Sequence, residues 1–432
     1  MTRSSDDTPR TSPPPQASET LTGFKDWFWR PPRPHGATIH DRVVSNLELF
    51  YDLAYATVIG EAAHHLASDV SARTIAEFAV VFTMIWFAWI NGSLYLEIHG
   101  RQDGRTRTFV FLQMGILVLL AVFAGSATGE GGGSFALAYA GLFTVLGWLW
   151  YSVRRQDEPE YAALTGVYVV GMAISVAVAA GSALLPVDAR LAIWAAFCFA
   201  WVVAFVVFGR IREFEVALAP THSMVERFDL FTIIVLGEVI IGVVDGLSHA
   251  DRDVVTIATG LLALFVGFGF WWSYFDVIGR RLPRPAGTAT VTWLLSHLPI
   301  TMAIAAAGAA MTSLVGYAHD PSSPPAIAWL ISGAVALGLL ALVPAALALE
   351  DAAELRPVYR KIGSTMIVGA VAALVVGWLQ APPWAMGLLL AAILVMVWLV
   401  VIVRFLRAHA WSEAEAEAGV EGRASPLADL GS

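Results

Sequence analysis

The sequence predicts an all-α polytopic membrane protein with about twelve transmembrane helices, on the evidence of its composition, its apolar runs and its charge distribution. Of 432 residues, 57% are hydrophobic and 14% are charged, whereas an ordinary soluble domain has roughly 25% charged residues. The apolar residues come in long runs, and about 20 such residues let a helix cross a bilayer. The net charge of −9 argues against a groove for nucleic acid. We therefore exclude a soluble enzyme and a nucleic-acid binder, and expect the lipid bilayer as the surrounding partner.

Twelve apolar runs follow one another between two polar tails. Residues 1–43 contain many Ser, Thr, Pro and charged residues and predict a disordered cytoplasmic tail. Residues 406–432 predict a second cytoplasmic tail, which starts with a short acidic helix at SEAEAEA. The predicted spans are, in order, 44–66, 73–97, 108–127, 135–153, 160–181, 191–209, 225–246, 254–277, 288–316, 326–349, 363–380 and 384–405.

The distribution of Lys and Arg tests this count of spans. If the runs alternate in direction, twenty-three of the 26 basic residues lie in the tails and the even-numbered loops. The other loops contain only Arg73, Arg190 and Arg252. Because loops rich in Lys and Arg stay inside the cell, both termini are predicted to be cytoplasmic and the number of spans to be even. We expect a multi-pass protein of the plasma membrane.

An internal repeat relates the first span to the seventh. Asp52-Leu53 is followed after six residues by Gly60-Glu61, and Asp229-Leu230 is followed after six residues by Gly237-Glu238. The next spans end in Tyr-Leu-Glu97 and Tyr-Phe-Asp276. Six spans separate the copies, so the two copies run in the same direction. We predict two parallel six-helix repeats, residues 44–210 and 211–405, with a pathway between them.

Acidic side chains inside the predicted spans are the candidates for function, because an ionisable group at the bilayer centre is costly to insert. No Lys or Arg is expected in a span interior to neutralise these acids, and Arg227, at the start of the seventh span, is the nearest base. His297, which precedes Pro299, and Gln113 are candidates to hydrogen-bond to the acids or simply to kink and pack their helices. The acids are Glu48, Asp52, Glu61, Glu97, Glu226, Asp229, Glu238, Asp245 and Asp276.

Two interpretations of these acids stay open. In the first, Asp52, Asp229, Glu61 and Glu238 bind a cation or exchange a proton. In the second, they are protonated or hydrogen-bonded and hold the helices together. Glu61 lies nine residues beyond Asp52, on the opposite helix face, so both can line one narrow pore only if the helix bends. Acids nearer the interface, such as Glu48, are equally suited to helix capping.

Other motifs give weaker indications. Glu61-Ala-Ala-His64 places an acid and a histidine on one helix face, as some di-metal proteins do, but the second copy lacks the histidine and we predict no metal site. The tryptophan clusters, including Trp86 with Trp89 and Trp271 with Trp272, are expected at the membrane interface. The sequence contains no nucleophile elbow, H-E-x-x-H motif or nucleotide fingerprint, so we predict neither an enzyme nor a cofactor.

The stretch ELFYDLAYATVIGEAAHHL at residues 48–66 resembles the signature of the bacterial low temperature requirement protein A (LtrA) family. The resemblance continues in ERFDLFTIIVLGE at 226–238, FWWSYFD at 270–276 and SHLP at 296–299, and implies a many-spanning membrane protein named for growth in the cold. The family pattern favours Gly at the position of Asp229, which gives Asp52 more weight than its counterpart. A looser likeness in architecture is to lysosomal potassium channels built from two six-span repeats.

The preferred hypothesis is a cation- or proton-linked transporter or channel, whose site lies between the repeats and uses the acids above. The alternative is a non-transporting sensor or scaffold linked to cold or stress adaptation, in which the acids hold helices together. A membrane-embedded enzyme ranks third, since only Glu61, His64 and His65 offer candidate chemistry. The sequence is also compatible with a homo-oligomer.

Overall fold

A bundle of long α-helices makes up the computed structural model, which describes residues 28–35, 42–154, 156–159, 161–211 and 219–423. Most of the predicted N-terminal tail and the end of the C-terminal tail lie outside the described residues. The long helices are α2 (Asn46–Ser68), α3 (Ala72–His99), α4 (Gly104–Ala124), α5 (Gly132–Val153), α6 (Ala162–Ser182), α7 (Val187–Phe208), α9 (His222–His249), α10 (Val254–Phe275), α11 (Gly287–Gly316), α12 (Pro325–Leu347), α13 (Arg356–Leu379) and α14 (Pro383–Arg423).

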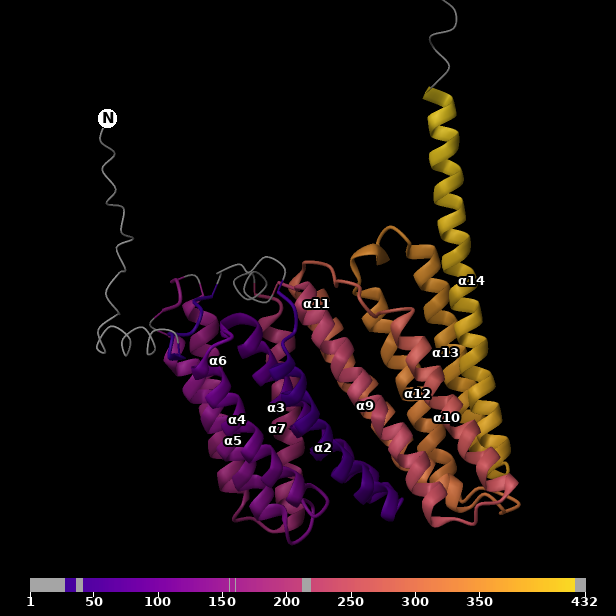
Figure 1. The fold of residues 1–432 in the computed structure, drawn as a ribbon, viewed down its shortest axis with the longest axis horizontal. Coiled ribbons are helices and arrows are strands. Elements are labelled where there is room, and N and C mark those ends of the chain that lie inside the picture. Colours follow the sequence, from indigo (N-terminus) through magenta and orange to yellow (C-terminus); the bar gives the residue numbers. More distant parts are fainter. Residues whose placement is uncertain (1–27, 36–41, 155, 160, 212–218, 424–432) are drawn as a thin grey trace, which may run out of the picture.

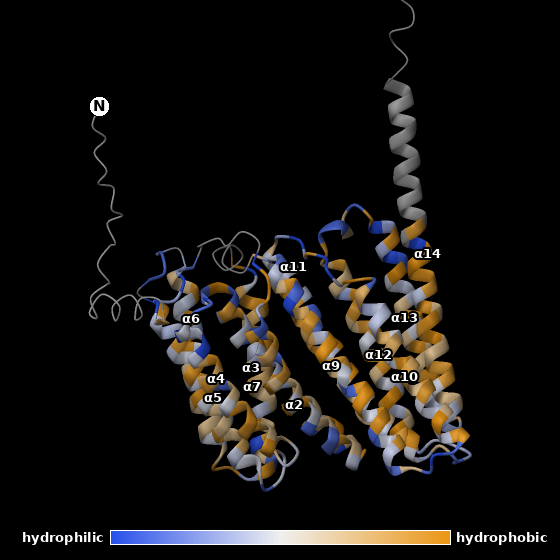
Figure 2. Cartoon of the chain, viewed as in Figure 1, coloured by the Kyte–Doolittle hydropathy of each residue, from blue (hydrophilic) through white to orange (hydrophobic). Residues whose placement is uncertain are grey.

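These twelve helices coincide with the twelve predicted spans, and most of their ends fall within four residues of the predicted ones. By length and composition, eleven are apolar enough to cross a membrane. The exception is α2, whose 23 residues include Glu48, Asp52 and Glu61. Figure 2 shows apolar residues along the helices, with hydrophilic residues gathered at the loops. Large apolar side chains such as Val122, Phe199 and Trp378 are exposed on the outside of the bundle, as a lipid-facing surface requires.

The helices form two groups, which Figure 1 shows side by side. In the first group, α2 packs against α3 and α4, α4 against α5, α5 against α6, and α3 against α7. In the second group, α9 packs against α10 and α11, α11 against α12, α12 against α13, and α10 against α14. The groups meet where α2 contacts α9 and α11. We call this contact the central seam.

Side-chain caps fix where several helices begin. Ser45 accepts a hydrogen bond from the backbone N–H of Glu48 while the Glu48 carboxylate accepts one from the N–H of Ser45, which forms a capping box. Asp103, Thr221 and Asp253 each accept a hydrogen bond from the N–H three residues on, at the starts of α4, α9 and α10. Each cap supplies a partner for an N–H that the helix itself leaves free.

Two helices of the second group approach each other unusually closely. A Cβ atom added to Gly242 of α9 would lie 2.1 Å from the carbonyl oxygen of Gly308 in α11, and one added to Gly308 would lie 2.7 Å from that of Glu238. The hydroxyl of Thr312 donates to the Gly242 carbonyl oxygen at 3.1 Å. Only glycine permits this distance between backbones, a packing mode common among membrane helices.

Successive helices run in opposite directions, so the ends of the bundle differ in charge. We call the end where α2 begins and α3 ends the arginine-rich end, because Arg33, Arg42, Arg101, Arg281 and Arg284 lie there. Helix α14, whose 41 residues span about 60 Å at 1.5 Å per residue, extends beyond this end (Figure 1). The acidic segment predicted as a separate short helix is thus continuous with the last span.

Candidate functional site

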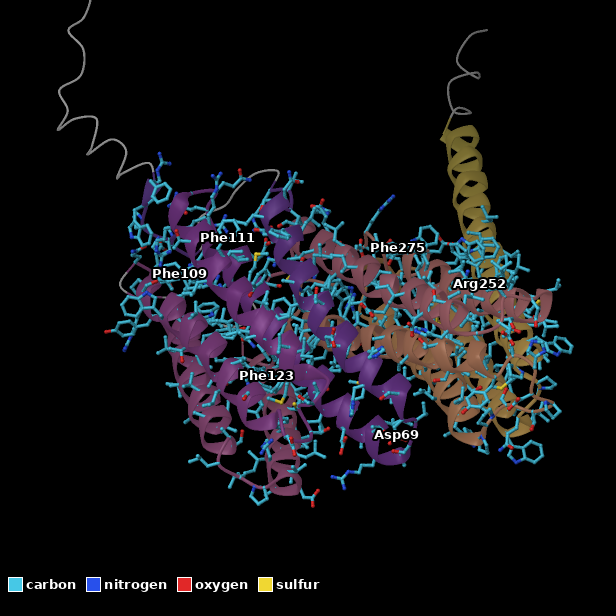
Figure 3. All side chains as sticks on the ribbon, turned by 60° about the horizontal axis from the view of Figure 1, so that its bottom comes forward. Asp69, Phe109, Phe111, Phe123, Arg252 and Phe275 are labelled. Carbon is cyan, nitrogen blue, oxygen red and sulfur yellow. The ribbon has the colours of Figure 1, made fainter. Side chains whose placement is uncertain are left out.

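Charged side chains lie at three levels along the central seam, and side chains fill the spaces between the helices (Figure 3). The first level is at the arginine-rich end, the second is a buried ion pair one turn further in, and the third is a cavity toward the opposite end, where α2 ends next to Asp69.

At the arginine-rich end, Arg42 joins acids of two helices. Its guanidinium forms an ion pair with Glu48 of α2 at 2.6 Å and another with Glu97 at the end of α3. The hydroxyl of Ser223, at the start of α9, donates to Glu97 at 2.6 Å. Burial lowers the pKa of Arg42 from its ordinary value, while the charge of Glu48 acts in the opposite direction. We call these residues, together with Glu226, the Arg42 cluster.

Glu226 completes this level, because its carboxylate accepts a hydrogen bond from the backbone N–H of Val44 at 3.2 Å. Glu48, Glu97 and Glu226 thus come together at the arginine-rich end. Asp276 does not join them: it accepts a hydrogen bond at 2.5 Å from the indole of Trp398 in α14. The contact between α10 and α14 holds Asp276 on the side of α10 away from the seam.

The second level is an ion pair between the two helix groups. Asp52 of α2 is fully buried, and one of its oxygens accepts hydrogen bonds from Arg227 of α9 at 3.1 Å and from the indole of Trp89 in α3 at 2.8 Å. Within the described residues, the other Asp52 oxygen and two guanidinium nitrogens of Arg227 have no hydrogen-bond partner. The site therefore contains a buried salt bridge with unused hydrogen-bonding capacity.

This ion pair corrects two expectations from the sequence. Arg227 is inside α9 and only 2% exposed, so the prediction that no base neutralises the buried acids is wrong for Asp52. Trp86 and Trp89 are fully buried and do not belong to an interfacial belt, whereas Trp271 is 41% exposed. Residue spacing along one helix could not have revealed these contacts, because Asp52, Trp89 and Arg227 come from three different helices.

Asp229, the counterpart of Asp52, has a different set of partners. Its carboxylate accepts hydrogen bonds from the hydroxyl of Tyr274 and from the backbone N–H of Arg280, each at 2.9 Å. Arg280 has a φ of 62°, a left-handed conformation that directs this N–H. The Tyr274 hydroxyl also lies 3.0 Å from His297. His297 therefore reaches an acid through tyrosine. Gln113 instead accepts a hydrogen bond from the hydroxyl of Tyr51 at 2.7 Å, and the neighbour of that hydroxyl is Tyr55 at 3.1 Å.

The third level contains Glu238. The residue is 8% exposed, and its carboxylate lies against Gly60 of α2, where an added Cβ would be 3.1 Å away. It lines a cavity of 120 Å³ with His64, Asp245, Thr312 and Gly308, so residues of α2, α9 and α11 share the cavity. Glu61 is exposed while Asp52 is buried, in agreement with the prediction that they occupy different helix faces.

Apolar side chains separate the second level from the third. Arg227 and Glu238 lie eleven residues apart and share one face of α9, about 16 Å apart along the helix. Between them on this face are Phe231 and Val235, both at most 1% exposed. The ring of Trp89 stacks on Phe231 with centroids 3.9 Å apart. The cavity is thus closed toward the arginine-rich end.

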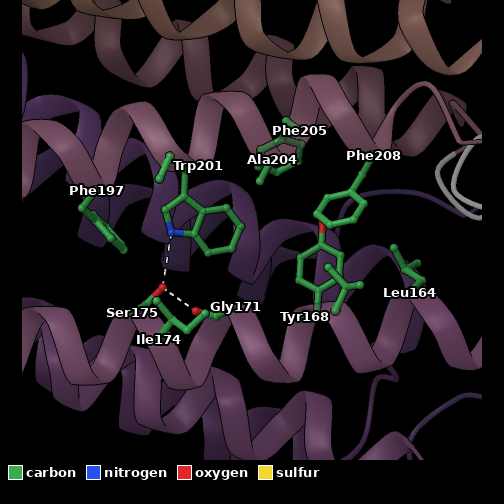
Figure 4. A pocket seen from close by; sticks show the side chains of 12 residues that line it. Leu164, Tyr168, Gly171, Ile174, Ser175, Phe197, Trp201, Ala204, Phe205 and Phe208 are labelled. Atoms are coloured by element: carbon green, nitrogen blue, oxygen red, sulfur yellow. Dashed lines mark hydrogen bonds between the residues drawn. The ribbon is translucent and has the colours of Figure 1, made fainter.

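A second cavity lies away from the seam, between α6 and α7 (Figure 4). It has a volume of 180 Å³, and its lining includes Tyr168, Phe197, Trp201 and Phe208. Its polar contact is a hydrogen bond from the Trp201 indole to the Ser175 hydroxyl at 3.3 Å. Because no ionisable acid or base lines it, this cavity offers no charge chemistry, and the seam is the better candidate site.

The fold and the seam define a multi-pass α-helical membrane protein with an ionic contact between two groups of helices. Comparison with known families is consistent with this class. The bacterial low temperature requirement A protein (LtrA) family matches residues 43–403, so the chain belongs to that family and the resemblance seen in the sequence is confirmed. The matched region contains the whole of α2 through α13 and, apart from Arg42 itself, the residues of all three levels of the seam.

A relative in Rhizobium meliloti (strain 1021), the "Uncharacterized protein RA0937", is 24% identical to this chain over 281 residues. The match covers 59% of this chain and 65% of that protein, just under two thirds of the relative's length. No solved structure matches the chain. The relative's printed name assigns no activity, so a function has to be argued from the seam.

Proposed function

We propose that the protein carries a small cation or a proton across the bacterial plasma membrane along the central seam. The observation that supports this proposal is that charged groups from both helix groups follow one seam at three levels. Buried ionisable residues in a membrane protein are costly, and they mark ion pathways and proton relays. The Arg42 cluster, the Asp52–Arg227 pair and Glu238 are the groups that an ion would meet in turn.

The proposal includes two parallel repeats, residues 44–210 and 211–405, with both termini in the cytoplasm. Its support is the packing: the contacts of α2 with α3 and α4, and of α3 with α7, correspond to those of α9 with α10 and α11, and of α10 with α14. Asp52 and Asp229 also have matching places near the starts of α2 and α9. Transporters built from parallel repeats bind their substrate at the interface between the repeats, which here is the seam.

The conformation described above is closed. Ion pairs of Arg42 join α2 to α3 at the arginine-rich end. Further in, the apolar contact of Trp89 with Phe231 separates the Asp52–Arg227 pair from the Glu238 cavity. Transport then requires α2 to move against α9, which breaks the Asp52–Arg227 pair and opens the cavity toward the other side. An exchange of partners of this kind is a known way for packed helices to switch between two states.

The test is ion flux in proteoliposomes that contain the full chain. We expect movement of H⁺, Na⁺ or K⁺ above that of empty vesicles, and a fall of about tenfold or more in Asp52→Asn and in Glu238→Gln, since each removes an ionisable group from the seam.

The matched control is Glu77→Gln. Glu77 is equally buried but lies away from the seam, paired with Arg73 at 2.7 Å, so its flux should stay at the wild-type level. Absence of flux for all three ions contradicts transport. Unchanged flux in both seam variants contradicts the assignment of the seam as the pathway.

The alternative is a sensor or scaffold without transport, and one observation favours it. The Arg42 cluster and the Asp52–Arg227 pair both connect the two helix groups, as expected of groups that only hold a structure together. Under this alternative no flux occurs, and the seam variants lower the melting temperature of the purified protein without any effect on ion movement.

A further inference from the structure

Glu238 differs from the other buried acids of the seam in having no partner. Asp52 binds Arg227 and Trp89, Asp229 binds Tyr274 and the Arg280 backbone, and Glu48 and Glu97 bind Arg42. Among the described residues, neither oxygen of Glu238 has a hydrogen-bond or ion-pair partner, although the residue is 8% exposed. The carboxylate faces the cavity, and a charge at such a place, with no protein group bonded to it, is only weakly compensated for the bulk water that it loses.

The surroundings of Glu238 are poor in ligands for a metal cation. A cation that sheds its water needs several oxygen atoms in place of the water. The nearby backbone carbonyls belong to the continuous helices α2, α9 and α11 and accept intrahelical hydrogen bonds. The Thr312 hydroxyl is already bonded to the Gly242 carbonyl. No group of three His, Cys, Asp or Glu residues suited to a metal occurs among the residues that the structure describes.

A proton requires only the carboxylate itself. Uptake of one proton removes the charge of Glu238 and, with it, the cost of burying that charge. The other titratable groups that face it are Glu61 and His64 from α2 and Asp245 from its own helix; α11 contributes none. Asp245 is 30% exposed and contacts His249 at 3.3 Å, which connects the cavity with the end opposite the arginine-rich end.

We propose that Glu238 is a proton-binding site, loaded from the end opposite the arginine-rich end, and that the ion coupled to transport is the proton. This inference rests on the proposed function, because it names the ion that the seam carries. In the closed conformation, Phe231 and Val235 keep the bound proton from reaching Asp52. Release toward the arginine-rich end then follows the movement of α2 against α9.

Carbodiimide labelling tests the site without any measurement of transport. Dicyclohexylcarbodiimide reacts with protonated carboxyl groups in apolar surroundings: the carboxyl oxygen bonds to the central carbon, and the carboxyl proton moves to nitrogen. We treat the full chain in proteoliposomes over a series of pH values and locate the adduct by peptide mass spectrometry. We expect labelling at Glu238 that declines as the pH rises. Glu77, which is buried but paired with Arg73 and Thr128, should stay unlabelled.

The labelling and the flux assay together distinguish the two proposals. Labelling at Glu238 with proton flux that Glu238→Gln reduces about tenfold or more supports both. Labelling without flux of any ion supports the proton site and contradicts transport. Flux without labelling at Glu238, or flux of Na⁺ or K⁺ that continues without proton movement, overturns the inference and leaves transport standing. Absence of both overturns both.

Discussion

At the scale of single residues, the position of Arg227 decides the chemistry of the seam. Arg227 occupies the place in α9 that Phe50 has in α2, and Phe50 is 52% exposed on the outside of the bundle. The second helix group thus has a buried arginine where the first has an exposed phenylalanine, and this arginine binds the aspartate of the first group. Asp229 has no such partner and uses Tyr274 instead.

A double-mutant cycle on Asp52 and Arg227 measures how strongly the two residues are coupled. Removal of one member of a buried ion pair costs about 3–5 kcal/mol, because the other charge stays buried without compensation. We expect Asp52→Asn and Arg227→Met each to lower the apparent melting temperature in detergent. The double variant should recover part of the loss, since no unpaired charge remains.

The matched pair for this cycle is Glu77→Gln with Arg73→Met. Arg73 is mostly exposed, with 65% of its side chain accessible, and an exposed ion pair contributes at most about 1 kcal/mol. This second cycle should show little coupling. Strictly additive losses in the Asp52 and Arg227 variants would contradict the buried pair.

At the scale of helices, the close approach of α9 and α11 positions Glu238. The Gly308→Ala variant places a methyl group 2.7 Å from the backbone carbonyl oxygen of Glu238. The backbone must shift to make room, so we expect a loss of about 1–3 kcal/mol in the free energy of unfolding. Thermal unfolding in detergent measures the loss.

Gly316→Ala is the control on the same helix, because a Cβ there meets nothing within 4 Å. Alanine is a better helix former than glycine, so this variant should be neutral or slightly more stable. Equal effects of the two substitutions would mean that helix propensity, and not the contact with α9, determines the outcome at Gly308.

The sequence predicts the helices well and their partners poorly. Apolar run length locates all twelve helices, because a helix that crosses a bilayer needs about 20 mostly apolar residues. The start of α13 is the largest error at a helix beginning: the structure begins it at Arg356, whereas residue 363 was predicted, because charged residues there continue the helix beyond the apolar run. Hydrophobicity marks where a helix is apolar, not where its hydrogen bonds begin.

For the candidate site, too, the sequence identifies the acidic residues but not the residues that they contact. Glu48, Glu97, Glu226, Asp52 and Glu238 were predicted from their place in apolar spans, and all five lie at the seam. Arg42, Trp89 and Ser223 were missed as partners. Hydropathy and residue spacing describe one helix at a time. Arg42, Trp89 and Ser223 belong to the site because they contact residues of another helix, so only the packed structure identifies them.

At the scale of the whole molecule, orientation in the membrane is open to a direct test. Cys198 is the single cysteine of the chain, so Cys198→Ala gives a background for cysteine labelling. In that background, Asp320→Cys marks the loop between α11 and α12, and Lys361→Cys marks the start of α13, at the opposite end. Both positions are exposed.

With cytoplasmic termini, a membrane-impermeant maleimide should label Asp320→Cys in intact cells and should label Lys361→Cys only after the cells are opened. The physical reason is the distribution of Lys and Arg, whose loops stay inside the cell. Labelling of Lys361→Cys in intact cells would invert the proposed orientation and, with it, the side from which Glu238 is loaded.

The ion pair between the two helix groups also has a consequence for synthesis. A ribosome delivers α2 to the membrane well before α9 exists, since about 175 residues separate Asp52 from Arg227. During that interval Asp52 can accept a hydrogen bond from Trp89, but Arg227 is not yet present to neutralise its charge. The first helix group expressed by itself therefore contains an acid, Asp52, without its arginine partner. Assembly of the bundle is complete only when the second helix group inserts and α9 packs against α2.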